Sequence, residues 1–400
     1  MRVLLSTWGS RGDVEPLLGL ALELRAQGVD VRMCAPPDFA ERLAEVGVPF
    51  VPMGFPVREL VASKPSPVEV AAALVAQHFD VIGKAAEYCD AVVATGLMPA
   101  GVRSVAEHLD IHYVHAGFHL IGMPSLHYPP GPRPGKPFPP DETDLRVLWK
   151  IDAERVDAMY REPLNTHRGA LGLPPVDNVR DHIFTSQPWL AMDPVLWPFQ
   201  DALGFDVVQT GAWIMPDDRP LPADLVEFLE AGEPPVYVGF GSMQMAGAPD
   251  VAVVAVEAIR AQGRRALVSR GWAGLALIDE KDDCFAVGEA NHRELFRRVA
   301  AVVHHGGAGT TTTAALAGAP QVIVPQIVDQ PYWAQRVAEL GIGAGHDGPT
   351  PTVESLSTAL EPALRDDTNA RAKEVSTTIR TDGASVAARK LINLIDQVPE

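Results

Sequence analysis

A glycine-rich stretch in the second half of the chain decides the fold class: His304-His305-Gly306-Gly307-Ala308-Gly309-Thr310. It directly follows apolar residues 301–303, which are typical of a short buried strand. The pattern from Thr310 to Ala317 is helical, so the stretch joins a strand to a helix. Glycines let the backbone turn sharply, and the first N–H groups of the helix can then bind an anion. The stretch therefore predicts a phosphate site, to which a histidine can add a charge-assisted hydrogen bond.

Strands and helices alternate on both sides of this stretch. Apolar strands are expected at 3–7, 29–35, 91–94, 111–115, 236–240, 266–269, 285–287, 301–304 and 321–324, and the first helix is expected from Pro16 to Gln27. Each half opens with a strand and a Gly/Ser loop, at 9–12 and at 239–242. The pattern predicts an α/β protein with two Rossmann-like, doubly wound domains facing a central cleft, with ligands at the carboxyl ends of the strands.

The length of 400 residues agrees with two domains. We expect an N-terminal domain at 1–212, a proline-rich linker at 213–235 and a C-terminal domain at 236–384. The last residues, 385–400, are expected to form a helix that could pack back on the N-terminal domain. A second proline-rich segment lies at 124–140, where eight of seventeen residues are proline, so it is a stiff surface loop. A spacer and a pocket rim are both open interpretations of that loop.

Composition excludes several classes of function. The formal net charge of −18 argues against nucleic acid and against anionic membrane surfaces, because both attract basic proteins. The three cysteines are far apart and form no Cys-x-x-Cys pair, so neither a disulfide scaffold nor a zinc knuckle is indicated. Neither a signal peptide nor a long apolar span is visible, which favours a cytoplasmic location.

Several motifs together resemble a known enzyme family. The stretch 304–310, Gly318-Ala319-Pro320 and Pro325-Gln326-Ile327-Val328-Asp329-Gln330-Pro331 are similar to the donor-binding signature of GT-B nucleotide-sugar glycosyltransferases. The start of the chain, from Arg2 to Pro16, resembles their bacterial natural-product branch. More narrowly, residues 33–37, 172–176, 209–213 and 269–272 resemble enzymes that glycosylate vancomycin- and teicoplanin-type heptapeptides. The resemblance covers essentially the whole chain.

The resemblance implies roles for particular residues. The donor diphosphate would be held by Ser10, Arg11, Ser242, His305, Gly307, Ala308, Gly309 and Thr310. The donor sugar would be held by Asp329 and Gln330, and the nucleoside by Trp272 and Val287. The acceptor would contact His115, His119 and Pro129. His115-x-x-x-His119 could also suggest zinc, but it lacks the glutamate of His-Glu-x-x-His and a third ligand, so we expect no metal.

Asp13 is the candidate general base. It follows the first strand, and the acceptor hydroxyl must lose a proton as it attacks the anomeric carbon. A purely structural role, capping the first helix near Glu15 and Pro16, is the alternative interpretation. The resemblance favours catalysis.

The resemblance implies an inverting transfer of glucose or N-acetylglucosamine from a UDP- or dTDP-linked donor to a hydroxyl of a glycopeptide aglycone. The nucleotide sugar is a co-substrate, and no cofactor is expected. The chain has no Asp-x-Asp motif, which agrees with metal-independent transfer. Three alternatives stay open: transfer of a dTDP-linked deoxyaminosugar, a nucleotide-sugar epimerase, and a catalytically silent nucleotide-sugar-binding partner.

Overall fold

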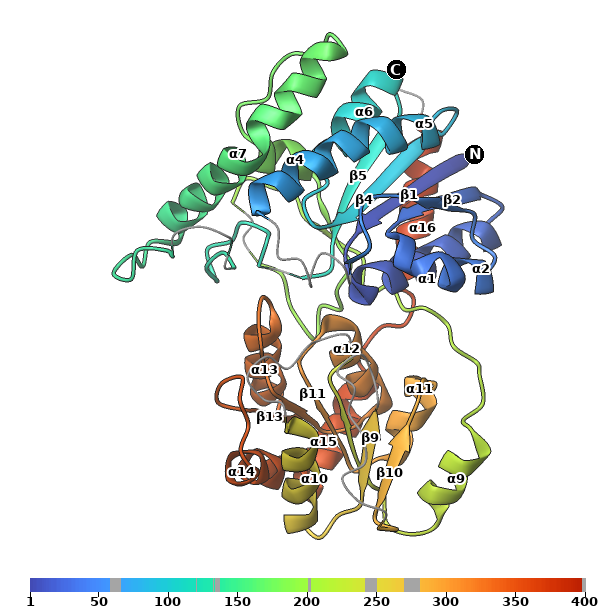
Figure 1. Ribbon diagram of the computed structural model, residues 1–400, viewed down its shortest axis with the longest axis vertical. Coiled ribbons are helices and arrows are strands. Elements are labelled where there is room, and N and C mark those ends of the chain that lie inside the picture. The colour runs from blue at the N-terminus through green and yellow to red at the C-terminus, as the bar shows by residue number, and fades with distance from the viewer. Residues whose placement is uncertain are drawn as a thin grey trace. The chain divides into compact units, whose positions relative to one another are not determined.

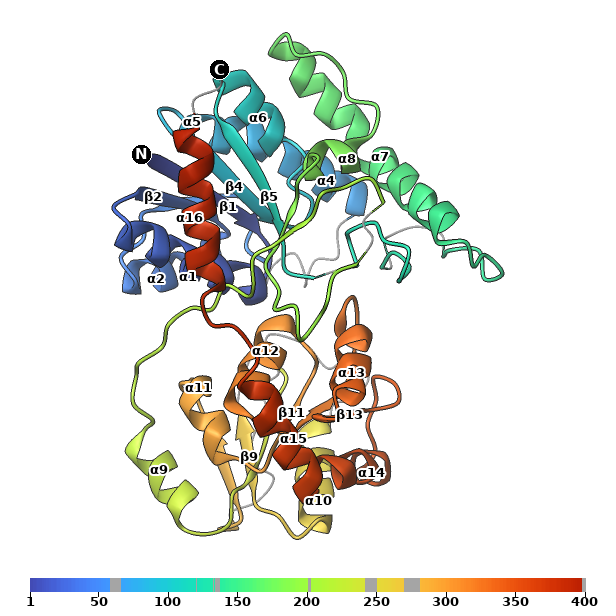
Figure 2. The same cartoon turned by 180° about the vertical axis from the view of Figure 1, so that it is seen from behind.

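The structure is a computed structural model that describes residues 1–57, 66–119, 121–131, 133, 137–200, 203–241, 250–269 and 281–397. Its contacts divide the chain into two compact units. The first unit contains residues 1–193, 198–215 and 380–400, and the second contains 194–197 and 216–379. Each unit is an α/β domain built on a parallel sheet, as Figures 1 and 2 show, so the predicted fold class is confirmed.

The first unit contains a seven-stranded parallel sheet in the order β3-β2-β1-β4-β5-β6-β7 within the described residues. Its strands are β1 (Arg2–Trp8), β2 (Asp30–Ala35), β3 (Phe50–Pro52), β4 (Ala91–Gly96), β5 (His112–Gly117), β6 (Trp189–Leu190) and β7 (Val208–Gln209). The central strands are short and almost entirely buried, which is typical of a parallel sheet covered on both faces.

Helices cover both faces of this sheet. One face packs on α1 (Arg11–Ala26), α2 (Ala40–Glu45) and α16 (Gly383–Asp396). The other packs on α4 (Pro67–Gln77), a π-helical turn (His78–Ile82), α5 (Gly83–Ala85) and α6 (Val102–Leu109). The long helix α7 (Leu145–Ala170) and α8 (Val179–Phe184) form a further layer beside α4. Figure 2 shows the C-terminal helix α16 alongside α1, and the apolar side chains of both helices share one core.

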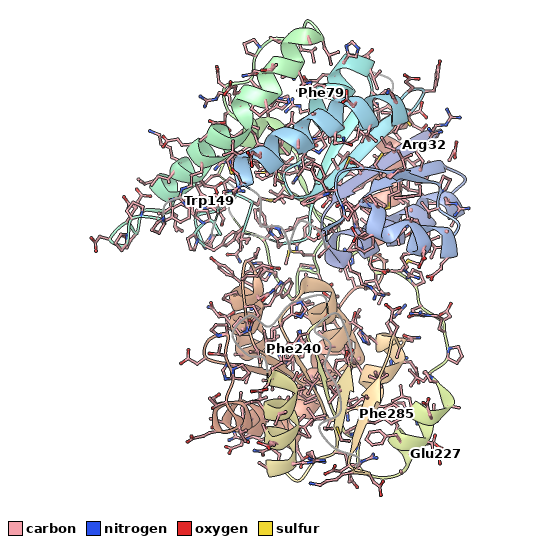
Figure 3. All side chains as sticks on the ribbon, viewed as in Figure 1. Arg32, Phe79, Trp149, Glu227, Phe240 and Phe285 are labelled. Carbon is pink, nitrogen blue, oxygen red and sulfur yellow. The ribbon has the colours of Figure 1, made fainter. Side chains whose placement is uncertain are left out.

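The second unit contains a six-stranded parallel sheet in the order β10-β9-β8-β11-β12-β13 within the described residues. Its strands are β8 (Val236–Gly239), β9 (Ala266–Ser269), β10 (Cys284–Val287), β11 (Ala301–His304), β12 (Gln321–Ile323) and β13 (Gly343–Gly345). One face packs on α10 (Val251–Ala261) and α14 (Val353–Ala363), and Phe240, labelled in Figure 3, lies in this layer. The other face packs on α9 (Ala223–Glu230), α11 (His292–Leu295) and α12 (Ala308–Ala317).

Two further helices, α13 (Gln330–Glu339) and α15 (Asp366–Ser376), complete the second unit. Residues 194–197 form a short excursion of the chain from the first unit into the second. This excursion contacts α13, because Arg336 donates hydrogen bonds to the carbonyl oxygens of Val195 and Leu196 at 2.7 and 2.9 Å. Within the described ranges, no helix combines the length and the apolar character needed to cross a membrane.

Candidate functional site

The 304–310 loop begins at the carboxyl end of β11, in the middle of the second sheet. Gly306 adopts a φ of +93°, and a Cβ there would lie 2.7 Å from the side chain of Ile323, so only glycine fits. The helix α12 begins at Ala308, two residues earlier than predicted, with Gly307 as its N-cap and no side chain capping it. The first N–H groups of α12 therefore remain available to an anion, as the predicted roles of Ala308, Gly309 and Thr310 require.

His305 lies beside this helix start. Its ring packs so close to Gly307 that a Cβ there would be 2.7 Å from Nε2, and a Cβ on Gly241 would be 3.5 Å from Cε1. Within the described residues its Nδ1 is buried without a hydrogen-bond partner. Burial lowers the pKa of His305 to about 4, and the nearby carboxylate of Asp329 opposes that shift. The unsatisfied Nδ1 agrees with a ring held ready for a ligand.

His304 is a structural residue that the sequence analysis did not single out. It is fully buried, its Nδ1 accepts the N–H of Gly306 at 3.1 Å, and its Nε2 lies 2.9 Å from Oε1 of Gln321. Gln321 in turn donates to the carbonyl oxygen of Thr311 at 3.3 Å. Because Nδ1 must accept, the ring is neutral with its proton on Nε2, in agreement with a pKa lowered by burial to about 3. The pair links the glycine turn to α12.

Asp329 and Gln330 lie where β12 continues into α13. Gln330 is buried, and its Oε1 accepts the N–H groups of Gln326 and Ile327 at 2.7 and 3.1 Å. Asp329 occupies the N-cap position of α13, but its carboxylate accepts the indole N–H of Trp333 at 2.8 Å and caps no backbone N–H. Val328, before it, has a φ of +60°, which is strained for a β-branched residue. The side-chain amide oxygen of Gln330 thus fixes the backbone of the loop that carries Asp329.

In the first unit, Ser10 and Asp13 form a capping box at the start of α1. The N–H of Ser10 donates to Oδ2 of Asp13 at 2.8 Å, and Oγ of Ser10 accepts the N–H of Gly12 at 3.3 Å. The prediction that this helix starts at Pro16 is wrong: it starts at Arg11, because the capping box forms upstream and Pro16 is tolerated inside the helix. Arg11 pairs with Glu15 at 3.2 Å. Asp13 is therefore part of the helix cap, and its catalytic role stays a prediction.

Of the predicted acceptor residues, His115 lies in β5, His119 follows that strand, and Pro129 lies in the proline-rich loop. His115 is buried against Phe184, with ring centroids 4.7 Å apart, and burial lowers its pKa to about 3. The Nδ1 atoms of His115 and His119 are both buried without a hydrogen-bond partner in the described part of the chain. Pro129 is exposed. Burial is the main cause of the lowered pKa of His115, and the nearby His119 adds to it.

Helix α7 holds the proline-rich loop. The indole N–H of Trp149, labelled in Figure 3, donates to the carbonyl oxygen of Tyr128 at 3.1 Å. Arg133 in the loop pairs with Asp152, which is fully buried and also lies 3.6 Å from Arg180. Two cations around one buried carboxylate compensate for its lost hydration. Tyr128 and Arg133 of the loop are therefore fixed to the body of the first unit, which is more than a spacer requires.

Two of the predicted donor residues, Ser242 and Trp272, lie outside the described residues. Val287 ends β10, and its side chain is buried in the core together with Leu267 and Phe296. Among the described residues, no group of three or more acidic, histidine or cysteine side chains could hold a metal ion.

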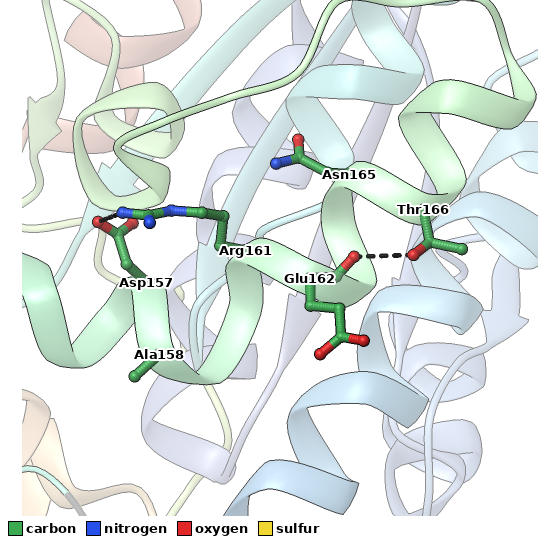
Figure 4. Close-up of a pocket in the computed structure, with 6 residues that line it drawn as sticks. All are labelled: Asp157, Ala158, Arg161, Glu162, Asn165 and Thr166. Carbon is green, nitrogen blue, oxygen red and sulfur yellow. Dashed lines mark hydrogen bonds and ion pairs between the residues drawn. The ribbon is translucent and has the colours of Figure 1, made fainter.

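Figure 4 shows a surface hollow on α7, lined by Asp157, Ala158, Arg161, Glu162, Asn165 and Thr166. Asn165 exchanges two hydrogen bonds with the backbone of Val176, and Asp157 accepts the backbone N–H of Val179 at 2.8 Å. These contacts hold α7 to the segment that follows it, while the ion pair of Asp157 with Arg161 lies within α7. None of the predicted site residues lines the hollow, so we assign it no part in the chemistry.

Comparisons with known proteins agree with this geometry. Residues 3–116 match the glycosyltransferase family 28 N-terminal domain, and residues 286–390 match the erythromycin biosynthesis protein CIII-like C-terminal domain. The vancomycin aglycone glucosyltransferase of Amycolatopsis orientalis is 56% identical and covers 99% of this chain and 98% of its own. The dTDP-epi-vancosaminyltransferase of the same organism is 48% identical, covering 94% of this chain and 93% of its own.

Among solved structures, the glycosyltransferase of kitacinnamycin aligns with a TM-score of 0.74 at 20% identity, over 98% of both chains. At that identity the match shows the fold alone, and the family assignment depends on the much higher identity of the Amycolatopsis enzymes. Both lines agree with the resemblance found in the sequence motifs. The chain belongs to the GT-B glycosyltransferases and is closely related to the glycopeptide glycosyltransferases of Amycolatopsis orientalis.

Proposed function

We propose that this enzyme transfers a hexose, glucose or N-acetylglucosamine, from a UDP- or dTDP-linked donor to a hydroxyl of a glycopeptide aglycone. The observation that carries the donor class is the uncapped start of α12 beside His305, whose buried Nδ1 has no partner in the described part of the chain. The backbone N–H groups of the helix start and an N–H of the histidine ring are hydrogen-bond donors of the kind that bind a diphosphate. The acceptor class is supported by the 56% identity to the vancomycin aglycone glucosyltransferase.

The proposed reaction is a single displacement with inversion. The acceptor oxygen forms a bond to the anomeric carbon, the bond from that carbon to the diphosphate oxygen breaks, and Asp13 takes the acceptor proton. Negative charge then grows on the leaving diphosphate. The N–H groups of Ala308, Gly309 and Thr310 and the ring of His305 stabilise that charge, since preorganised donors act most strongly where charge develops.

Metal-independent transfer is part of the proposal. The positive end of the α12 dipole and the histidine supply the stabilisation that a divalent cation gives in other phosphate sites. Full activity after treatment with EDTA is the expected result, and activity that returns only with added Mg²⁺ or Mn²⁺ would contradict it.

The test is mass spectrometry of heptapeptide aglycones incubated with the enzyme and UDP-glucose, UDP-N-acetylglucosamine or their dTDP counterparts. Addition of one hexose is the expected product. A second candidate is transfer of a dTDP-linked deoxyaminosugar, favoured by the 48% identity to the dTDP-epi-vancosaminyltransferase. A product mass with a deoxyaminosugar and none with a hexose would select it. A donor that is isomerised without acceptor would indicate an epimerase, and a bound donor without turnover a silent binding partner.

A further inference from the structure

We infer that Trp333 and Trp197 are positioning residues that hold the carboxylate of Asp329 in the orientation in which it binds the hexose of the donor. The inference depends on the proposed function and on the prediction from the sequence motifs that Asp329 holds the donor sugar, here by accepting hydrogen bonds from its hydroxyls. All the residues concerned lie within the second unit.

The first step of the argument is the behaviour of Asp329 itself. An aspartate at an N-cap normally accepts a backbone N–H from the first turn of its helix. Here no such bond forms, and Oδ2 accepts the indole N–H of Trp333, one helical turn later, at 2.8 Å. The carboxylate is thus turned from the usual capping geometry toward a side chain. Oδ1 accepts no hydrogen bond from the described residues, so it is available to a ligand.

The second step is the rigidity of Trp333. Only 2% of this residue is exposed, and an indole has a single N–H donor at a fixed place on a rigid ring. The ring of Trp197 packs edge-on against it, with centroids 5.9 Å apart and planes at 76°. Trp197 makes a similar contact with Tyr332 at 5.8 Å. The donor to Asp329 is therefore held from one side by its own helix and from another by Trp197.

The third step is the anchoring of Trp197. It belongs to the four-residue excursion 194–197, whose neighbours on both sides are part of the first unit. Arg336 of α13 donates to the carbonyl oxygens of Val195 and Leu196, and Leu196 is buried. The excursion is therefore attached to the helix that Asp329 begins. A role that served only to join two parts of the chain would not need an aromatic ring against Trp333.

The experiment compares the affinity for UDP-glucose with that for UDP, and for dTDP-glucose with that for dTDP, by isothermal titration calorimetry. Trp333→Phe keeps an aromatic side chain at this position but removes the N–H together with one ring of the indole. We expect it to weaken binding of the sugar nucleotide on the order of tenfold, the value of one hydrogen bond to a charged group, and to leave nucleotide binding unchanged. Asp329→Ala should show the same selective loss. Trp197→Leu should show a smaller loss of the same kind, and Trp197→Phe should largely restore it.

The matched control is Trp213→Phe, which removes a buried indole hydrogen bond to Thr210 in the first unit and should change neither affinity. If Trp333→Phe keeps the wild-type preference while Asp329→Ala loses it, the inference is wrong and the proposed function stands. An equal loss of nucleotide and sugar-nucleotide binding in Trp333→Phe would also overturn the inference, because it would indicate general damage. If Asp329→Ala keeps the preference, Asp329 does not bind the sugar. Wild-type protein that binds none of the four probes would overturn the proposed function itself.

Discussion

Two strand-to-helix loops of this enzyme, one after β1 and one after β11, both contain glycines but differ in how the helix that follows is capped. After β1, Ser10 and Asp13 cap α1 with their own side chains, so part of the hydrogen-bonding capacity of the helix start is already used. After β11, Gly307 supplies no cap, and the first turn of α12 is open beside His305. A helix start becomes an anion site when its N–H groups are left unsatisfied by the chain itself. In the proposed reaction the leaving diphosphate binds at the second of these loops, and the first presents the carboxylate of Asp13.

The largest expected effect comes from replacing the carboxylate in the self-capped loop. In Asp13→Asn the amide oxygen can still accept the N–H of Ser10, so the cap persists while the base is lost. We expect kcat to fall by roughly 10²- to 10⁴-fold, the usual contribution of a general base, with the free energy of unfolding changed by less than about 1 kcal/mol.

The control for this variant is Thr352→Ala, which removes the N-cap of a second capping box, on α14. It should cost about 1 kcal/mol of stability and leave kcat unchanged. Steady-state kinetics and urea unfolding measure both quantities. If Asp13→Asn loses stability but keeps its turnover, Asp13 is only a cap.

The second largest effect concerns the buried support of the open loop. His304→Leu leaves the N–H of Gly306 and Oε1 of Gln321 without partners in a site that excludes water. We expect a loss of about 2–6 kcal/mol in the free energy of unfolding, since each of the two buried polar groups left without a partner costs about 1–3 kcal/mol. The KM for the sugar nucleotide should also rise, because the turn at Gly306 loses the hydrogen bond from its N–H to His304.

A double-mutant cycle tests this interpretation. Adding Gln321→Leu to His304→Leu should cost less than Gln321→Leu alone in the wild type, because both members of the pair are then removed. Denaturant unfolding of the four proteins gives the coupling energy. Additive losses would mean that His304 and Gln321 act independently.

The sequence could predict where both loops lie, and it could not predict which one is open. Glycines and the apolar strands before them were enough to locate each loop, and the turn at Gly306 follows from residue type alone. Helices α1 and α12 start earlier than the sequence predicts, because Pro16 is typical of the first turn of a helix and Gly307 has no side chain that could mark an N-cap. A cap is a matter of side-chain geometry, so only the structure distinguishes a self-capped helix from an open one.

The residues that support the candidate site could not be predicted from the sequence for a different reason. His304 and Gln321 are seventeen residues apart and meet only because β11 pairs with β12 in one register. The contact of Trp333 with Asp329 spans four residues on one helix and could have been proposed from that spacing. The link from Arg133 to Asp152 requires knowing how the proline-rich loop returns to α7. The residues predicted to bind the ligand form local sequence patterns, whereas most of the residues that support them are brought together by long-range packing.

A third variant converts the open loop toward the closed one. Gly307 has a φ of −65° and a ψ of 138°, so serine fits the backbone and its Oγ can cap α12. The added Cβ would lie 2.7 Å from Nε2 of His305 and would displace that ring. Serine and glycine differ by only a few tenths of a kcal/mol at an N-cap, so stability should change by less than about 0.5 kcal/mol.

The affinity of Gly307→Ser for UDP should nevertheless fall roughly 10- to 100-fold, since the hydroxyl competes for the same N–H groups and the histidine is moved. Calorimetric titration with UDP and thermal unfolding measure the two effects. Wild-type affinity in this variant would mean that the diphosphate does not use the start of α12.

The smallest effect is a pH dependence that only the open loop should show. The pKa of His305 is lowered to about 4 by burial, so its ring is neutral in the free enzyme at pH 7. A bound diphosphate favours the charged ring and raises this pKa, so the complex takes up a proton that the free enzyme does not hold. The affinity for UDP-glucose should therefore rise severalfold as the pH falls from 8 to 5, and level off near pH 4, where the free ring also becomes charged.

UDP-glucose is the right probe because its diphosphate, esterified at both ends, does not titrate in this window. Titrations in buffers of different ionisation enthalpy should detect the proton uptake, and His305→Gln should abolish it. A wild-type protein that binds without taking up a proton would show that hydrogen bonds from the neutral ring and the helix start are enough to hold the leaving group.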